Sequence, residues 1–165
     1  MNPLSGKIEF VLKEFGELSV HELYKIMRLR QAVFVVEQAC VYQDADGKDL
    51  VCLHLLGRTP TGAIVSYLRI LPPGQRYEEA SMGRFLVDAA VRREGLGRQT
   101  ALEGIRVTRE RFPGTGIRVS GQAYLLRFYE SLGFQTIGEP YLEDGIPHIE
   151  MYLPLVGPVD GAARV

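Results

Sequence analysis

The sequence predicts an α/β domain of the α+β type, in which helices cover both faces of one mixed sheet. Three observations predict this fold class. Several short segments alternate apolar and polar residues or are continuously apolar, other segments repeat apolar residues with helical spacing, and Gly- and Pro-containing turns separate them. Their order is strand, helix, three strands, helix, strand, helix and two strands. Strands mixed with helices in this order are typical of a two-layer or three-layer domain built around a sheet.

The first half of the chain contains one helix and four of the expected strands. Residues 7–15 alternate in polarity, which is typical of a strand with one buried face. Ser19 and Glu22 have the spacing of a capping box and predict the start of a helix that ends near residues 34–38. Its apolar positions are Val20, Leu23, Tyr24, Met27 and Phe34. Three apolar runs follow, at residues 50–58, 63–71 and 80–87, and we expect three successive antiparallel strands.

The second half of the chain contains two helices and three strands. Residues 96–111 have helix-forming composition, with Ala101, Leu102 and Ile105 on one side, and the turn at 112–116 ends this helix. A short strand at 117–121 precedes a compact helix at 122–134, in which Gly133 has the position of a left-handed C-terminal cap. The last two strands begin near residues 134 and 148.

Length and composition limit the class of protein. With 165 residues, 46% of them hydrophobic, the chain has the size of one domain, which we place at residues 1–155, followed by a flexible tail at 156–165. The net charge of −1 disfavours nucleic acid as a partner, and the apolar runs are too short to span a membrane. Cys40 and Cys52 form no metal-binding pair, so we expect reduced thiols, no metal and a cytoplasmic protein.

The segment from Arg92 to Arg98 lies between a predicted strand and a predicted helix. Backbone N–H groups at a helix N-terminus attract anions, and Gly95 and Gly97 lack side chains that would hold a phosphate away. Arg92, Arg93 and Arg98 can add charge-assisted hydrogen bonds. The segment lacks the Gly-Lys-Ser/Thr of a Walker loop and the third glycine of a dinucleotide fingerprint. It is therefore either a pyrophosphate loop or an ordinary loop with exposed arginines.

The pattern Arg92-x-x-Gly95-x-Gly97 resembles the pyrophosphate loop of the GNAT superfamily of N-acetyltransferases. The segments RQAVFVVEQ, GRFLV, SGQA, FYESLGF and EDGIPHIEM are similar, in this order, to the ElaA-like branch of that superfamily. The resemblance covers about residues 8–155. It implies a mostly antiparallel sheet of about seven strands that splays between the fourth and fifth strands, and acetyl-CoA as co-substrate with no metal.

The resemblance also implies roles for individual residues. The pantetheine arm of CoA would lie in the splay, against the main chain of Leu86 and Val87, and the Val87 amide would stabilise the oxyanion. Tyr129 has the position of the tyrosine that protonates the departing thiolate, although a lone tyrosine on a helix is more often a core residue. Gln122 would either bond the pantetheine or cap the following helix. The expected cofactor-binding residues are Leu86, Val87, Arg92, Arg93, Glu94, Gly95, Leu96, Gly97, Arg98 and Gln122.

The acceptor amine must lose a proton, and four residues compete as the base: Glu37, His54, Glu143 and His148. His54 lies inside an apolar run, where a hydrogen-bonded core histidine is at least as expected as a catalytic one. We prefer His148 and Glu37, because by resemblance the loop before His148 borders the acceptor pocket. The same resemblance places Tyr42–Gly47 over the acceptor site, whereas the residues alone indicate a turn. Arg84 should meet an acidic partner or an anionic substrate.

The expected activity is transfer of an acetyl group from acetyl-CoA to a primary amine by direct attack on the thioester. The acceptor would be a small molecule or the amine of a peptide or protein. Two alternatives stay open: an acyltransferase with another acyl donor, as in acyl-homoserine lactone synthases, and a non-catalytic acyl-CoA sensor. An exposed sheet edge would make a homodimer unsurprising.

Overall fold

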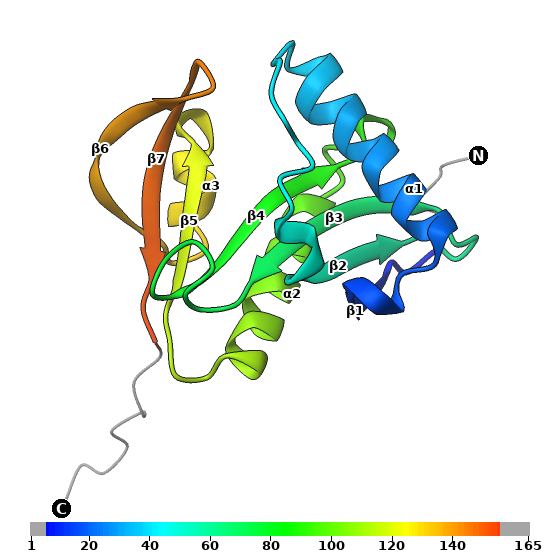
Figure 1. Cartoon of the computed structure of the whole chain (residues 1–165), viewed down its shortest axis with the longest axis horizontal. Helices are drawn as coiled ribbons and strands as arrows, with labels where there is room; N and C mark the ends of the chain where they lie inside the picture. Colours follow the sequence, from blue (N-terminus) through cyan, green and yellow to red (C-terminus); the bar gives the residue numbers. More distant parts are fainter. Residues whose placement is uncertain (1–5, 156–165) are drawn as a thin grey trace, which may run out of the picture.

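The computed structural model describes residues 6–155, and one seven-stranded sheet runs through them (Figure 1). The strand order is β1-β2-β3-β4-β5-β7-β6, and β4–β5 is the parallel pair in an otherwise antiparallel ladder. The predicted fold class is confirmed. The strands are β1 Glu9–Glu14, β2 Leu53–Arg58, β3 Ile64–Leu71, β4 Ala80–Val87, β5 Ile117–Gln122, β6 Gln135–Glu143 and β7 Ile146–Leu153. The tail predicted to be flexible, 156–165, lies outside the described residues.

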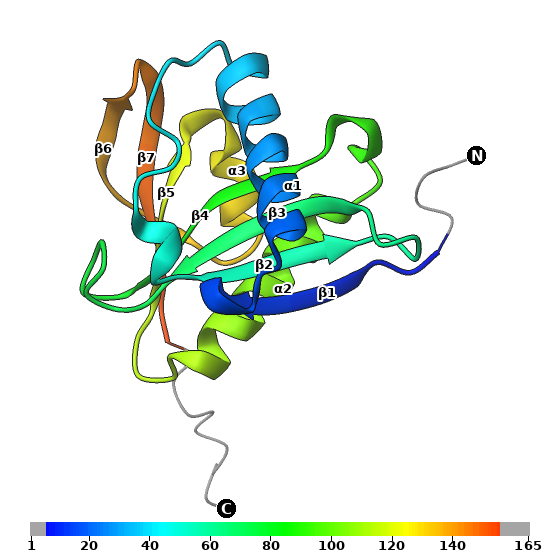
Figure 2. The ribbon, with the colours of Figure 1, turned by 45° about the vertical axis from the view of Figure 1, so that its right-hand side comes forward.

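Helices cover both faces of the sheet (Figures 1 and 2). Helix α1 (Val20–Arg30) continues into a π-helical segment at Gln31–Glu37, and together they pack on the face that presents Leu56, Tyr67 and Leu86. The opposite face packs against α2 (Leu96–Arg111) and α3 (Leu126–Glu130). No helix within residues 6–155 combines the length and the apolar character needed to cross a bilayer.

Two predicted helix faces differ from the observed ones. Val20 and Tyr24 were expected on the buried side of α1, but they are 82% and 69% exposed, and Ile26 and Arg30 face the sheet instead. Leu102 was expected beside Ala101, yet it is 47% exposed. The sheet-facing stripe of α2 includes Gly104, where an added Cβ would lie 3.1 Å from Leu68. The close approach of the backbone to the sheet at Gly104 therefore helps to determine which side of α2 is buried.

Strands β4 and β5 part from each other after two residue pairs. They pair only at Ala80–Ile117 and Ser81–Arg118, near the start of both strands. Beyond this point β4 follows β3, with an irregularity opposite Tyr67–Arg69, where Arg84 has a φ of +48°. A residue in the left-handed region at a bulge bends its strand and adds twist. The predicted splay is confirmed, and it leaves a wedge between β4 and the β5-β7-β6 part of the sheet, seen in Figure 1.

A buried network of ion pairs fastens the segment after α1 to the sheet. Arg30, fully buried, donates through Nε to Asp44 at 2.9 Å and through Nη1 to Asp49 at 2.7 Å. Arg84, at the bulge of β4, donates to the other carboxylate oxygen of Asp44 at 2.7 Å. The segment Tyr42–Gly47, whose residues alone indicate a turn, is thus held to α1 and β4 by the ion pairs of Asp44.

Strand β3 supplies the third arginine of the network. Arg69 bonds Asp46 at 2.8 and 2.9 Å and Asp49 at 3.1 Å. Burial by itself raises the pKa of Asp46 and Asp49, but the hydrogen bonds from Arg69 and Arg30 outweigh burial and hold both pKa values below their ordinary range. The network thus pairs three arginines with three aspartates, and pairing of this kind is what buried charged groups require.

Replacing Arg30 with methionine should lower the free energy of unfolding by about 3 kcal/mol, because the buried carboxylates of Asp44 and Asp49 each lose one of their two arginine partners. Urea unfolding followed by circular dichroism measures this; the sequence has no tryptophan to report by fluorescence. The matched control is Arg106→Met, since Arg106 also contacts two carboxylates, Glu103 and Glu110, but in solvent. The control should leave the midpoint unchanged. Equal effects of the two substitutions would contradict a structural role for the network.

Candidate active site

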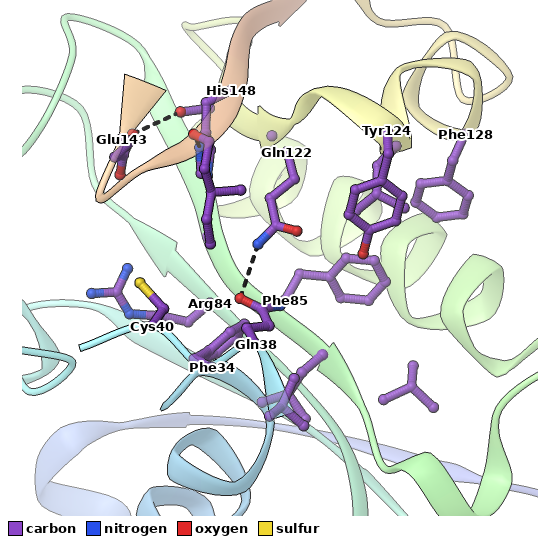
Figure 3. A pocket seen from close by; sticks show the side chains of 18 of the residues that line it. Phe34, Gln38, Cys40, Arg84, Phe85, Gln122, Tyr124, Phe128, Glu143 and His148 are labelled. Carbon is purple, nitrogen blue, oxygen red and sulfur yellow. Dashed lines mark hydrogen bonds between the residues drawn. The ribbon is translucent and has the colours of Figure 1, made fainter. Parts of the chain in front are cut away.

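The wedge contains a cavity of about 390 Å³. Its walls come from β4, from the π-helical segment after α1, from the N-terminus of α2, and from β5, α3 and the β6–β7 turn (Figure 3). Nine of the predicted site residues line it: Glu37, Leu86, Val87, Arg92, Arg93, Gly97, Gln122, Tyr129 and His148. Four predicted cofactor-binding residues do not line it: Glu94, Gly95, Leu96 and Arg98.

The N-terminus of α2 presents backbone amides beside this cavity. Gly95 is the N-cap residue with a φ of +78°, a conformation that favours glycine, and an added Cβ there would meet no atom within 4 Å. The first hydrogen bond of the helix is the one that the amide of Gln99 donates to the Gly95 carbonyl oxygen, at 3.2 Å. The amides of Leu96, Gly97 and Arg98 precede it and are available for an anion. The side chain of Leu96 is buried in the core, so only its main chain can serve a ligand.

The arginines of the loop differ in their partners. Arg92 bonds both carboxylate oxygens of Glu37, at 2.6 and 2.9 Å, and its Nε donates to the Val87 carbonyl oxygen at 3.0 Å. Arg98 turns away to the hydroxyl and carbonyl oxygens of Ser131. Arg93 is exposed and lines the cavity. Of the three, Arg93 therefore has the charge that is most available to a ligand.

The main chain of Val87 faces the wedge. The amide of Asp88 donates to the Val65 carbonyl oxygen at 2.8 Å, so the main chain of Asp88 faces β3. Because successive residues of a strand direct their N–H groups to opposite sides, the amide of Val87 points toward the gap and that of Leu86 toward β3. Leu86 lines the cavity while its side chain is buried against α1.

Tyr129 lies in the wall of the cavity and is held by aromatic neighbours. Its ring packs edge-on against Phe128 and Phe134, with centroid distances of 5.4 and 5.6 Å. The ring reaches β5 because residue 121 is glycine: an added Cβ there would lie 2.8 Å from the tyrosine ring. Burial raises the pKa of Tyr129, so its hydroxyl is protonated at neutral pH. None of the hydrogen bonds formed within residues 6–155 uses this hydroxyl.

Gln122 reaches across the wedge and does not cap a helix. It precedes the helical turn Ala123–Leu125, but its side chain makes no capping hydrogen bond there. Its amide nitrogen instead donates to the Gln38 side-chain oxygen at 3.0 Å, as Figure 3 shows. Of the two predicted roles for Gln122, capping is therefore wrong, and the side chain lies where a ligand in the wedge would pass.

The four candidate bases have different surroundings. The hydrogen bond from Arg92 lowers the pKa of Glu37, which makes this carboxylate a poor base. His54 is a core histidine: burial lowers its pKa, and both ring nitrogens are bonded, to the Tyr67 hydroxyl at 2.7 Å and the Asp49 carbonyl oxygen at 2.9 Å. His148 and Glu143 line the cavity side by side on neighbouring strands (Figure 3).

His148 has the tautomer that a base requires. Its Nδ1 lies 2.7 Å from the Ile146 carbonyl oxygen, and because a carbonyl only accepts, Nδ1 carries the proton. In the neutral ring Nε2 then keeps a free lone pair. Of the two preferred bases, His148 is thus the one whose geometry allows it to take a proton.

Within the described residues, one group of side chains has the spacing of metal ligands: Asp49, Cys52 and His54. The Asp49 carboxylate already bonds two arginines, and burial raises the pKa of Cys52 to about 12, which disfavours the thiolate that a metal needs. This group is better explained as part of the buried network than as a metal site.

Several cavity residues were not predicted from the sequence. Phe34, Gln38 and Cys40 come from the π-helical segment and the chain after it, and Arg76 and Ser120 come from the opposite side. Phe34, Gln38 and Ser120 lie in segments that carry the family resemblance, but their place at the cavity becomes visible only when the two parts of the sheet face each other. Arg84 meets the acidic partner that was expected of it, Asp44.

Comparison with known proteins identifies the family. Residues 30–155 match the model of the Acetyltransferase (GNAT) domain family. Protein ElaA of Escherichia coli is 42% identical over 146 residues, which cover 87% of this chain and 95% of that protein. A UPF0039 protein of Schizosaccharomyces pombe is 43% identical over 151 residues, which cover 91% of this chain and 99% of that protein.

Solved structures agree with these relatives. The crystal structure of Escherichia coli ElaA superposes with a TM-score of 0.83 at 40% identity, covering 89% of this chain and 99% of that one. An acyl-CoA N-acyltransferase from Pseudomonas aeruginosa superposes with a TM-score of 0.84 at 37% identity and the same coverage. The resemblance found in the sequence is confirmed: the chain belongs to the GNAT acetyltransferase family.

Proposed function

We propose that this protein transfers an acetyl group from acetyl-CoA to a primary amine by direct attack on the thioester. The observation that carries the proposal is the wedge itself, which places unpaired strand backbone, helix N-terminal amides and a buried tyrosine hydroxyl around one cavity. The name of its relative from Pseudomonas aeruginosa, acyl-CoA N-acyltransferase, supports an acyl-CoA donor. Release of free thiol from acetyl-CoA in the presence of pooled amines tests the proposal.

The residues of the wedge fit the chemical parts of CoA. The amides of Leu96, Gly97 and Arg98, with the charge of Arg93, would hold the diphosphate. Gly97 leaves room for it, since an added Cβ would be in ordinary contact with Phe85 and Val87, at 3.7 Å. The pantetheine arm would lie along the edge of β4 that faces the wedge, as an added strand does.

Three groups of this chain would then act on the reacting atoms. The amide of Val87 would donate to the carbonyl oxygen of the thioester as negative charge develops there. His148, through Nε2, would take the proton from the attacking nitrogen. Tyr129 would give its proton to the sulfur as the carbon–sulfur bond breaks, so that CoA leaves as a thiol.

The surroundings of the cysteines favour direct transfer over an acyl-enzyme. A nucleophilic cysteine needs a base or a cation that stabilises its thiolate. Cys40 lines the cavity, and the hydrogen bond that its thiol donates goes to the Asp144 carbonyl oxygen at 3.6 Å, which is neither a base nor a cation. Cys52 is buried, and its pKa is raised to about 12 by that burial. Direct attack requires both substrates to be bound together, which initial-rate kinetics with both varied can distinguish from a two-step exchange.

Replacing Tyr129 with phenylalanine should lower kcat about 100-fold, because the thiolate loses its proton donor. The dissociation constant for acetyl-CoA should stay within twofold, since the ring and its contacts with Phe128 and Phe134 remain. Thiol-release rates and calorimetry measure the two quantities. Tyr24→Phe on the exposed side of α1 is the control. Unchanged turnover in Tyr129→Phe would remove the acid role from this residue.

Replacing Gly97 with alanine should weaken CoA binding at least tenfold and leave the protein as stable as before or more so. The added methyl group fits the protein, and alanine favours a helix over glycine by about 1 kcal/mol. The loss of affinity would come from contact with the diphosphate. Calorimetry with CoA and thermal unfolding measure the two effects, and Gly114→Ala, in an open turn, is the control. Equal CoA affinity in both variants would refute the binding assignment.

A further inference from the structure

The acceptor side of the cavity contains a carboxylate that is held through only one of its oxygens. Oε2 of Glu143 accepts hydrogen bonds from the Ser120 hydroxyl at 3.1 Å, from the Tyr141 hydroxyl at 3.1 Å and from Nη2 of Arg76 at 3.3 Å. None of the hydrogen bonds formed within residues 6–155 uses Oε1. The carboxylate is thus fixed in place with one acceptor oxygen unused, and it lines the cavity.

Glu143 lies where the acceptor amine would arrive. Its partner Ser120 lies two residues beyond Arg118, the last residue of β5 that pairs with β4, so the carboxylate lies close to the point where the two strands part. His148, on the neighbouring strand, also lines the cavity, and Figure 3 shows both side chains on the same wall. A group bound to Glu143 would therefore lie beside the histidine that the proposed function assigns as base.

Glu143 is suited to bind a cation and poorly suited to remove a proton. Burial by itself raises its pKa, but the charge of Arg76 and the hydrogen bond from Ser120 outweigh burial and keep the pKa below its ordinary value. The side chain therefore stays ionised at neutral pH. An ionised carboxylate with one unused oxygen is a strong acceptor for an N–H group that carries positive charge.

The two ends of the cavity have net charges of opposite sign. At the CoA end, Arg92 and Glu37 neutralise each other, and Arg93 adds one positive charge. At the other end Arg84 is neutralised by Asp44 and Arg76 lies against Glu143, so that Asp144 adds one negative charge. This polarity suits an anionic donor at one end and a cationic acceptor at the other.

We propose that Glu143 is the residue that selects the acceptor, by binding the ammonium form of an aliphatic amine through Oε1 and holding it beside His148. This inference rests on the proposed function and names the substrate class of the same site. The bound ammonium gives one proton to Nε2 of His148, and the neutral nitrogen then attacks the thioester carbon. The carbon–sulfur bond breaks, and the sulfur takes its proton from Tyr129. The nitrogen loses its second proton to solvent as the amide forms, and exchange with solvent then returns the proton of Tyr129 and removes the one on His148. Glu143 keeps its charge throughout.

The test compares two acceptors of nearly equal shape and different charge. One is the best aliphatic primary amine of a panel; the other is the corresponding O-alkylhydroxylamine, in which oxygen replaces the methylene group next to nitrogen and which is uncharged at neutral pH. Glu143→Gln should raise KM for the amine about tenfold, because an amide cannot replace a charge-assisted hydrogen bond. It should leave kcat for the amine, and both constants for the hydroxylamine, within twofold.

Two further variants complete the design. Glu139→Gln, on the same strand but outside the cavity wall, removes the same charge and should change nothing. Glu143→Asp keeps the charge and should restore part of the loss for the amine. Circular dichroism establishes that each variant is folded.

The outcomes separate the inference from the proposed function. If the wild-type protein releases thiol and Glu143→Gln lowers the activity equally for both acceptors, or does not lower it, the inference is overturned. The acetyltransferase proposal then stays intact. A loss of kcat at unchanged KM makes Glu143 a base and also overturns it. Absence of thiol release by the wild-type protein with every acceptor of both kinds overturns the proposed function, and the inference falls with it.

Discussion

One carboxylate, that of Asp44, connects the parts of the molecule that form the cavity. Its two oxygens accept hydrogen bonds from Arg30 at the end of α1 and from Arg84 at the bulge of β4, and the Tyr42 hydroxyl adds a third at 2.9 Å. The bulge is the place where β4 bends away from β5. The same interaction therefore fixes the helix that covers the wedge, the segment along its rim and the bend that opens it.

Charge in this position has a consequence that an apolar contact would not have. Apolar side chains of similar volume could stabilise the domain as well as buried ion pairs do, since ion pairs lose hydration when they are buried. An ion pair, however, is strong only in a narrow range of distance and angle, and here it holds Arg84, whose own φ is +48°. The network thus fixes the position of the rim relative to β4, at the edge of the cavity.

The local pattern of the sequence predicted the elements well, and long-range pairing explains where it failed. The bounds of α2 follow from its glycine-rich start and its Pro-Gly end, and Gly133 has the left-handed φ of +94° expected of its cap. The buried side of α1 was wrong because Val20 and Tyr24 have helical spacing but no element of the sheet beneath them. Likewise, the segment around Asp44 and Asp46 was interpreted as a turn because it is rich in turn-forming residues. The arginines that pair with these two aspartates are 14 to 40 residues away in the chain, so no local pattern indicates them.

The cavity also shows why a list of candidate residues does not assign roles. In the sequence, Glu37, Glu143 and His148 competed as candidates for the base, with His148 and Glu37 preferred. In the structure Glu37 is neutralised by Arg92, Glu143 is anchored through one oxygen, and His148 alone directs a free lone pair from a ring whose other nitrogen is bonded. The roles that we propose for these groups, as base, cation binder and structural partner, differ in which of their atoms are already hydrogen-bonded. The roles proposed for Glu37, Glu143 and His148 therefore follow from the hydrogen bonds that each side chain forms within the protein itself.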